Sequence, residues 1–203
     1  MALQFTIGRK LGLGFAVLII STVFAFILTN LTLTDSKKKT DEVVNQITPS
    51  VAALEEFNIL LGNSHYLITK WKYWPSADYI GFKDSLRNLI SKDFPELKKG
   101  LDTLKTHWEK NSQLKLDSIT LETDNLFIDY RSEIMDQLVG MDSYRDVNVV
   151  FATDDALEEI DTRVIKIFNQ LRGLVQAQKI LAKQTTVKMY SAFTLLQIGR
   201  AHV

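Results

Sequence analysis

The 203-residue chain has no cysteine, only three prolines and nine glycines, and no excess of charge of either sign. Without cysteine, disulfides and thiolate metal sites are excluded, so any water-exposed part must be stabilised by packing alone. The 24 basic residues are balanced by 24 acidic ones, whereas nucleic-acid binding needs a basic surface, and we expect no nucleic-acid partner. The scarcity of proline and glycine, beside abundant leucine, isoleucine and charged residues, favours helix throughout.

One long uncharged run lies near the N-terminus, from Leu11 to Thr34. About 20 apolar residues in a helix cross the ~30 Å hydrocarbon core of a bilayer. The run is longer than the apolar part of a signal peptide and ends without a small-residue cleavage site. The sequence therefore predicts a cytoplasmic N-terminus over 1–10 and an uncleaved transmembrane helix over 11–34. Basic residues flank both ends of the run, so their count alone does not fix the orientation.

A second uncharged stretch follows Lys188 near the other end of the chain, with the sequence MYSAFTLLQ. We interpret residues 189–197 as the start of a second transmembrane helix. The last six residues place Arg200 and His202 where that helix should continue, and charges at such depth are costly. These six residues also match what a common sequencing adapter encodes in one reading frame. We expect 198–203 to be a non-native tail, and no functional argument includes it.

Between the two apolar stretches, heptad patterns predict long helices. The first, over 35–74, has a seam in which Pro49 produces a kink, and it ends at Trp74 because Pro75 disfavours helix in the residue before it. The last, over 149–188, has the more regular seam. The two seams are Val44, Ile47, Val51, Leu54, Asn58, Leu61, His65 and Ile68, and Leu157, Ile160, Val164, Ile167, Leu171, Leu174, Gln178 and Leu181.

Two further helices are expected between these, over 76–108 with a disturbance at Phe94–Pro95, and from about Gln113 to Val147. The third helix has one apolar face, made of Phe127, Tyr130, Ile134, Leu138 and Met141. The four lengths are similar and the connections short, which makes neighbouring helices antiparallel. The predicted fold is all-α: residues 35–188 form a membrane-anchored, antiparallel up-down-up-down four-helix bundle whose long first and last helices continue into the transmembrane segments. Trp108 is then expected near the bilayer interface.

The most suggestive cluster is Lys70, Trp71, Tyr73 and Trp74, close to Tyr79 and Phe82, at the turn between the first two helices. Cations beside aromatic rings can bind a small anion or a partner protein. The alternative is that these side chains only cap the tip of the bundle. We retain Lys70, Trp71, Tyr73 and Trp74 as weak candidates for ligand binding.

No other group of residues predicts chemistry. His65, His107 and His202 are isolated, so we expect no metal site. His65 lies on the first seam, where a polar residue often sets helix register or oligomeric state. The acidic run Asp154, Asp155, Glu158, Glu159 and Asp161 is interpreted as the solvated first turns of the last helix, where carboxylates suit the helix dipole. Without clustered acid, base or nucleophile positions, no catalytic residue, enzyme activity or cofactor is expected.

Two segments of the chain are FTIGRKLGLGFAVLII and QITPSVAALEEFNILL. The first resembles the first transmembrane span of bacterial methyl-accepting chemoreceptors and sensor histidine kinases, and the second resembles the first helix of their four-helix-bundle sensor domains. The resemblance implies an extracytoplasmic sensory module in the bacterial inner membrane that transmits a helix displacement. The expected partners are the lipid bilayer, a second copy of the chain in a homodimer, and an unknown small-molecule or protein ligand.

One departure from the family affects the ligand site. Aspartate-type chemoreceptors bind their ligand through arginines on the first helix, and this chain has no arginine between Asp35 and Trp74. The family's ligand pocket is therefore not carried over to this chain. The output module is also open, and a membrane-tethered scaffold or pore-forming bundle without a sensory role is the alternative function.

Overall fold

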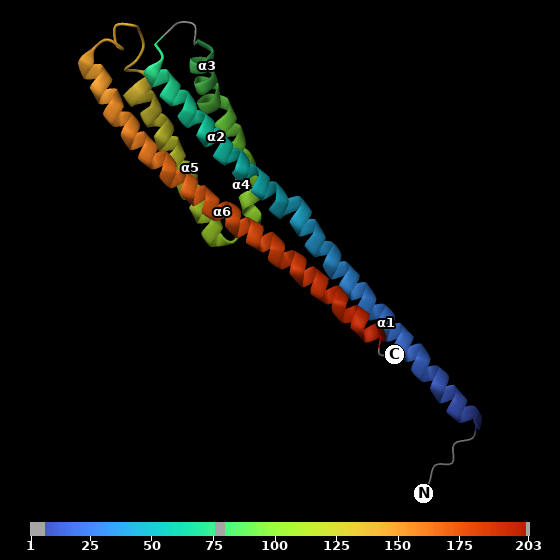
Figure 1. Ribbon diagram of the computed structural model, residues 1–203. Helices are drawn as coiled ribbons and strands as arrows, with labels where there is room; N and C mark the ends of the chain where they lie inside the picture. Colours follow the sequence, from blue (N-terminus) through green and yellow to red (C-terminus); the bar gives the residue numbers. More distant parts are fainter. Residues whose placement is uncertain (1–6, 76–79, 202–203) are drawn as a thin grey trace. The chain divides into compact units, whose positions relative to one another are not determined.

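The computed structural model describes residues 7–75 and 80–201, and in these ranges it is helical without a strand, which confirms the all-α prediction. Figure 1 labels the main helices. The α-helices are α1 (Ile7–Glu42), α2 (Thr48–Tyr73), α3 (Ile80–Asn88), α4 (Phe94–Leu104), α5 (Lys110–Asp129) and α6 (Val147–Ala201). Three π-helical segments, η1 (Val43–Ile47), η3 (Leu89–Asp93) and η5 (Tyr130–Met135), and one 3₁₀ turn, η4 (Lys105–His107), lie between them. The predicted start of the second helix, at Ser76, falls outside the described residues.

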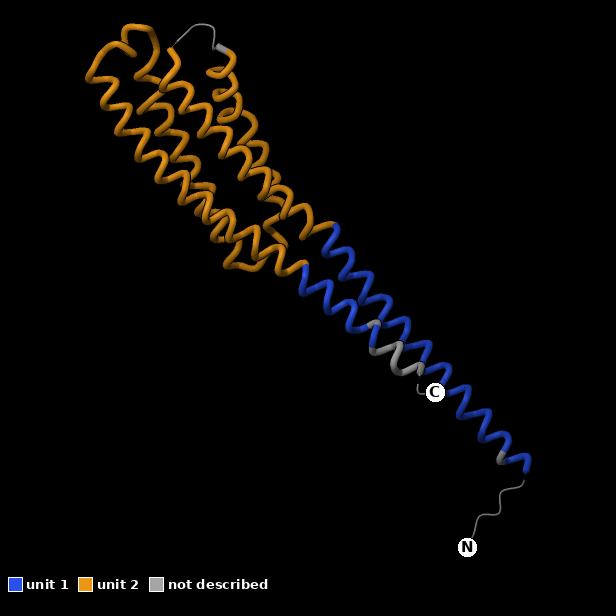
Figure 2. Tube along the Cα trace, viewed as in Figure 1, with its two compact units in different colours: residues 1–44, 183–203 blue, residues 45–182 orange. Residues whose placement is uncertain are grey.

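The chain divides into two compact units, coloured separately in Figure 2. Unit 1 comprises residues 1–44 and 183–203, and unit 2 comprises residues 45–182. Among the described residues, one helical stretch is long and apolar enough to cross a membrane; its most apolar window has a mean hydropathy of 2.6, and none of that window is buried. Within unit 1, α1 contacts the end of α6, where the Thr40 hydroxyl lies 3.2 Å from the Met189 sulfur.

Unit 2 has a single hydrophobic core to which α2, the α3–α4 segment, the α5–η5 segment and α6 all contribute. Four rings form its centre: Phe94 lies 5.5 Å from Phe57 and 5.1 Å from Phe127, and Phe127 lies 5.5 Å from Tyr130, measured between centroids. Tilted and edge-on ring pairs at such distances are favourable beyond the area they bury. The four helical segments are therefore joined through one packed interior.

The buried face of α2 is rotated relative to the predicted seam. Leu54, Leu61 and Ile68 are fully buried as predicted, whereas Asn58 and His65 are only half-buried. The remaining buried positions of α2 are taken by residues outside the predicted seam, namely Ser50, Phe57, Leu60, Ser64, Leu67, Trp71 and Lys72. The reason is that α2 packs against α3 and α4 as well as α6, so its buried arc is wider than the two-position seam of a helix pair.

The seam predicted for the last helix is confirmed from Leu157 to Gln178, all of whose members are buried in α6. The third helix ends earlier than predicted, at Met135 and not at Val147. Leu138 is still buried, but Met141 is half-exposed, so the predicted apolar face does not extend to it. A turn replaces the helix here, because the Gly140 carbonyl accepts hydrogen bonds from both the amide and the hydroxyl of Ser143.

Each of the two prolines predicted to disturb a helix follows a π-helical segment. Pro49 comes just after η1, and Pro95 just after η3. A proline has no amide hydrogen, and its ring collides with the carbonyl four residues earlier, which here belongs to Asn45 or Ser91. A wider turn relieves that collision without ending the helix. The helices therefore continue through both prolines, as the sequence predicts for Pro49.

Trp108 does not have the exposed interfacial side chain that the sequence predicts. Its indole is buried in the core of unit 2, and its Nε1 donates a 2.8 Å hydrogen bond to the Ser50 hydroxyl. The Ser50 hydroxyl in turn donates to the Gln46 carbonyl. The sequence pattern places Trp108 at a helix end, and a helix end that folds against α2 can bury a large ring whose polar atom finds a partner.

Candidate functional site

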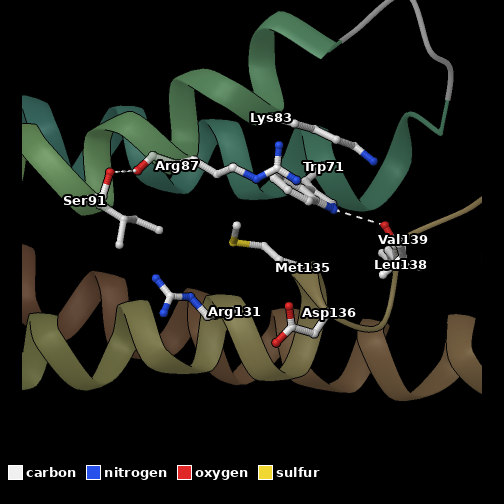
Figure 3. A pocket seen from close by; sticks show the side chains of 10 residues that line it. Trp71, Lys83, Arg87, Ser91, Arg131, Met135, Asp136, Leu138 and Val139 are labelled. Atoms are coloured by element: carbon white, nitrogen blue, oxygen red, sulfur yellow. Dashed lines mark hydrogen bonds between the residues drawn. The ribbon is translucent and has the colours of Figure 1, made fainter.

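A cavity of about 520 Å³ lies in unit 2 between the α3–η3 segment and the residues of η5 and the turn after it, with α2 closing one side (Figure 3). Its volume falls within the range of about 300–1,000 Å³ that is typical of small-molecule sites. Its lining is mixed, with three cations, one carboxylate and several apolar side chains: Trp71, Lys83, Arg87, Ile90, Ser91, Arg131, Met135, Asp136, Leu138 and Val139.

Trp71 is the aromatic wall of the cavity. The residue is 3% exposed, and its Nε1 lies 3.4 Å from the Leu138 carbonyl, which fixes the ring against the turn after η5. The Lys83 ammonium lies 4.7 Å and the Arg87 guanidinium 4.9 Å from the centre of the indole ring. Both are within the distance at which a cation is attracted by an aromatic face. The indole therefore holds two cations of α3 at the cavity.

Lys83 also links α3 to the segment that precedes α6. Its ammonium donates a 3.2 Å hydrogen bond to the Tyr144 hydroxyl, and that hydroxyl donates a 2.6 Å bond to the Trp71 carbonyl. Burial, and to a lesser degree the neighbouring Arg87 charge, lowers the pKa of Lys83. Burial raises the pKa of Tyr144 to about 12. The lysine is thus a cation in a partly desolvated position, with no carboxylate partner among the described residues.

The opposite wall consists of Arg131, Met135 and Asp136. Figure 3 shows Met135 extending from this wall into the space between Arg131 and the indole of Trp71. Within the described residues, the Arg131 guanidinium makes no ion pair or hydrogen bond, and the Asp136 carboxylate makes no ion pair. Arg87, on the first wall, is paired with Asp84 at 3.0 Å. Arg131 and Lys83 are therefore the cations of the cavity that lack a carboxylate partner.

Two π-helical segments supply opposite walls of the cavity. Ile90 and Ser91 belong to η3, and Arg131 and Met135 belong to η5. Single π-helical turns inside α-helices occur frequently at functional sites, because the extra residue in the turn changes which side chains face a neighbouring helix. Proline explains η3, but no proline follows η5, so the second wide turn has no such local cause.

Only one of the four residues proposed from the sequence as ligand-binding candidates lines the cavity. Trp71 lines the cavity, and Lys70, Tyr73 and Trp74 do not. The Lys70 ammonium instead lies 3.1 Å from the centre of the Trp74 ring, and Tyr73 is 57% exposed. Tyr79 falls outside the described residues, and Phe82 packs against the core.

Sequence reasoning missed the three cations that join Trp71 in the cavity. Lys83 and Arg87 are one helical turn apart on α3, which places them on one face. That spacing was the only feature of the sequence that could have grouped the two cations. No such feature connects Arg131 with them, because it lies on a helix distant in the sequence. The cavity depends on how α2, α3 and η5 pack.

Two of the acidic residues interpreted as a solvated helix face are paired with α2. Asp154 lies 3.1 Å from the ammonium of Lys72, which is 4% exposed and also donates to the Val150 carbonyl. Asp161 lies 2.6 Å from Nε2 of His65, so that histidine is bonded across the α2–α6 contact. Among the described residues no group of three or more acidic or histidine side chains could hold a metal ion.

Comparison of the chain with protein-family models, with curated proteins and with solved structures finds no match.

Proposed function

We propose that this chain is the sensory module of a bacterial transmembrane signalling receptor, in which a ligand bound to unit 2 displaces a helix that leads into the membrane. The observation that carries the proposal is the combination of a partly desolvated cationic cavity in a helical domain with an apolar α1 whose membrane-length window has no buried residue. An apolar helix without protein packing around it requires another apolar environment, and a bilayer supplies one.

The proposed architecture is an antiparallel up-down-up-down four-helix bundle anchored by α1 and by the end of α6. Its support is the single core shared by the four helical segments. We place the bundle on the extracytoplasmic side of the bacterial inner membrane, and we expect a homodimer. The resemblance of the first span and first helix to chemoreceptors and sensor kinases supports this location.

The element proposed to carry the signal is α6, which continues without a break from Val147 to Ala201. The segment before α6 is hydrogen-bonded to two residues that line the cavity, because Tyr144 accepts a hydrogen bond from Lys83 and donates one to the Trp71 carbonyl. A ligand that moves Lys83 would therefore pull on the start of α6. Helix shifts of ~1–2 Å are a known form of transmembrane switching.

The sensory proposal is tested by a substitution whose side chain fills the cavity in place of a ligand. Two spin labels, at Lys38→Cys and Val187→Cys, report the distance between α1 and α6 within unit 1, and the chain has no other cysteine to label. Ser91→Trp places a large ring in the cavity wall, and we expect it to change the reporter distance by ~1–2 Å in lipid nanodiscs. The matched control is Ser85→Trp, on an exposed position of α3 that does not line the cavity, and it should leave the distance unchanged.

If Ser91→Trp leaves the reporter distance unchanged while the protein keeps its helicity, the sensory proposal fails. The chain would then be a membrane-tethered scaffold or pore-forming bundle without a sensory role. Pore formation has its own readout, because such a bundle would release a dye from lipid vesicles and a sensory module would not.

A further inference from the structure

We infer that the cavity between α3–η3 and η5 binds a small organic anion, a compound with one or two carboxylates on a compact apolar body, and that Arg131 and Lys83 bind its charge. The inference rests on the proposed function, since it names the ligand class of the same cavity. It concerns a site within one chain, formed by segments far apart in the sequence.

The charge of the lining supports an anion. Arg131 has no carboxylate partner among the described residues, and Lys83 has only the neutral hydroxyl of Tyr144 and two aromatic rings. Among the described residues, Asp136 is the only carboxylate that lines the cavity. Lys83 is half-buried, so its charge is partly desolvated without an opposite charge, which is unfavourable; Arg131 is exposed, so its guanidinium is accessible to a ligand. An anion in the cavity would supply the missing negative charge.

The geometry of the cations favours carboxylate. A guanidinium presents parallel N–H donors that match the two oxygens of a carboxylate, and Arg131 is free among the described residues to use both. Lys83 supplies a point charge from the facing wall. The two cations come from opposite walls of the cavity.

The apolar part of the lining requires an organic body. Trp71, Ile90, Met135 and Leu138 contribute rings and aliphatic groups to the cavity, and 520 Å³ is far more than a small inorganic anion fills. Met135 extends into the space between the walls, and its flexible thioether adapts to different shapes. A flat or compact carbon skeleton would bury its apolar surface there, which inorganic phosphate cannot do.

The experiment measures binding by titration calorimetry to the full chain in nanodiscs of zwitterionic lipid. The probes are phthalate, benzoate, inorganic phosphate, and phthalamide, the neutral diamide analogue of phthalate. We expect phthalate to bind most tightly, benzoate more weakly, and phosphate and phthalamide at least tenfold more weakly than phthalate, because each lacks either the apolar body or the charge.

Two cavity variants and one control locate the site. Arg131→Gln and Lys83→Met should each weaken phthalate binding at least tenfold. Arg172→Gln removes an exposed arginine of α6 that does not line the cavity, and it should leave binding unchanged. Because Lys83 also bonds Tyr144, circular dichroism must show that the variant keeps its helicity. Arg131 makes no side-chain bond to any residue that the structure describes, so its variant alone decides the site if Lys83→Met unfolds.

The inference is overturned if none of the four probes binds, if phthalamide or phosphate binds as tightly as phthalate, or if Arg131→Gln binds phthalate as well as the unmodified chain does. Failure here is distinguishable from failure of the sensory proposal. If Ser91→Trp moves the reporter labels but no organic anion binds, the ligand class is wrong and the sensory function stands. If phthalate binds through Arg131 and the labels do not move, the site stands and the sensory function fails.

Discussion

At the scale of single residues, the buried bond between Trp108 and Ser50 is the clearest test of the core. Ser50→Ala leaves the indole N–H without its acceptor in a buried position. We expect a loss of about 1–3 kcal/mol in the free energy of unfolding, because an unpaired buried donor loses its hydration without compensation. Chemical denaturation of the full chain in nanodiscs measures it.

The matched control for this bond is the double variant. In Trp108→Phe the donor is gone, so adding Ser50→Ala should cost clearly less than it does beside tryptophan. Equal costs in the two backgrounds would show that the hydrogen bond contributes nothing, and that Ser50 acts only through its contact with the Gln46 carbonyl.

Lys83 gives the cavity a predictable response to pH. Its pKa is lowered by burial and by Arg87, so the ammonium loses its proton at a lower pH than an ordinary lysine does. Anion binding needs the charged form, and affinity for phthalate should therefore fall as the pH rises toward 10. Of the groups that face the Lys83 ammonium, Arg87 contributes to the lowered pKa, and Tyr144, whose pKa burial raises to about 12, stays neutral over this range.

Calorimetry at pH 7 and at pH 10 checks this response. The affinity of the unmodified chain should decrease between the two values, while that of Lys83→Met should be weak and independent of pH. A pH dependence that persists in Lys83→Met would assign the titration to another group.

At the scale of helices, two glycines occupy helix interiors without a structural need for glycine. Gly100 in α4 and Gly173 in α6 are exposed, and a Cβ at either would meet no heavy atom within 4 Å. Alanine at either position should raise the free energy of unfolding by about 0.5–1 kcal/mol, because it reduces the freedom of the unfolded chain. Thermal unfolding followed by circular dichroism measures the gain.

The control for Gly173→Ala is the reverse substitution, alanine to glycine, one helical turn further along α6. Ala177 is exposed on α6, and Ala177→Gly should lower stability by a similar amount. If Gly173→Ala and Ala177→Gly shifted stability in the same direction, local helix propensity would not be the cause.

Helix patterns were predictable from the sequence where the buried positions follow a regular spacing of three and four residues. The regular seam of α6 predicted its buried residues from Leu157 to Gln178. The seam of α2 was only half right, because α2 also packs against α3 and α4 and buries Phe57 and Trp71 on that side. The end of the third helix was misplaced because an apolar residue, Leu138, is buried from a turn as well as it would be from a helix.

At the scale of the whole molecule, the proposed topology predicts which positions are accessible from outside the cell. Ser143 is a half-buried residue in the turn before α6, where its neighbours Met141 and Asp142 are exposed, and Gly8 lies at the start of α1, beyond the apolar run. In intact cells a membrane-impermeant maleimide should label Ser143→Cys and should label Gly8→Cys only after the cells are permeabilised. The chain itself has no thiol that would add background.

Labelling of Gly8→Cys in intact cells with protection of Ser143→Cys would place the helical domain in the cytoplasm. Labelling of both in intact cells would mean that α1 does not cross the membrane. In either case the sensory proposal would lose its topology.

The candidate site was much less predictable than the helices. Local density of aromatic and basic residues selected Trp71, which lines the cavity, together with Lys70, Tyr73 and Trp74, which do not. Lys83 and Arg131 reach Trp71 from segments that are far apart in the sequence. No spacing rule connects them, since their proximity depends on packing between helices.

Three polar side-chain pairs connect α2 to α6 along unit 2. Glu55 meets Lys179 at 2.7 Å, His65 meets Asp161 at 2.6 Å, and Lys72 meets Asp154 at 3.1 Å. A slide of α6 by a full turn, ~5.4 Å, would break all three together, whereas a slide of 1–2 Å can bend them without breaking. The Glu55–Lys179 pair is half-exposed, so added salt weakens it, whereas the buried Lys72 ammonium is shielded from salt. High ionic strength should therefore weaken the contact of α6 with α2 first near Lys179. The contact between Asp154 and Lys72 should persist, so that α6 would rotate about that point.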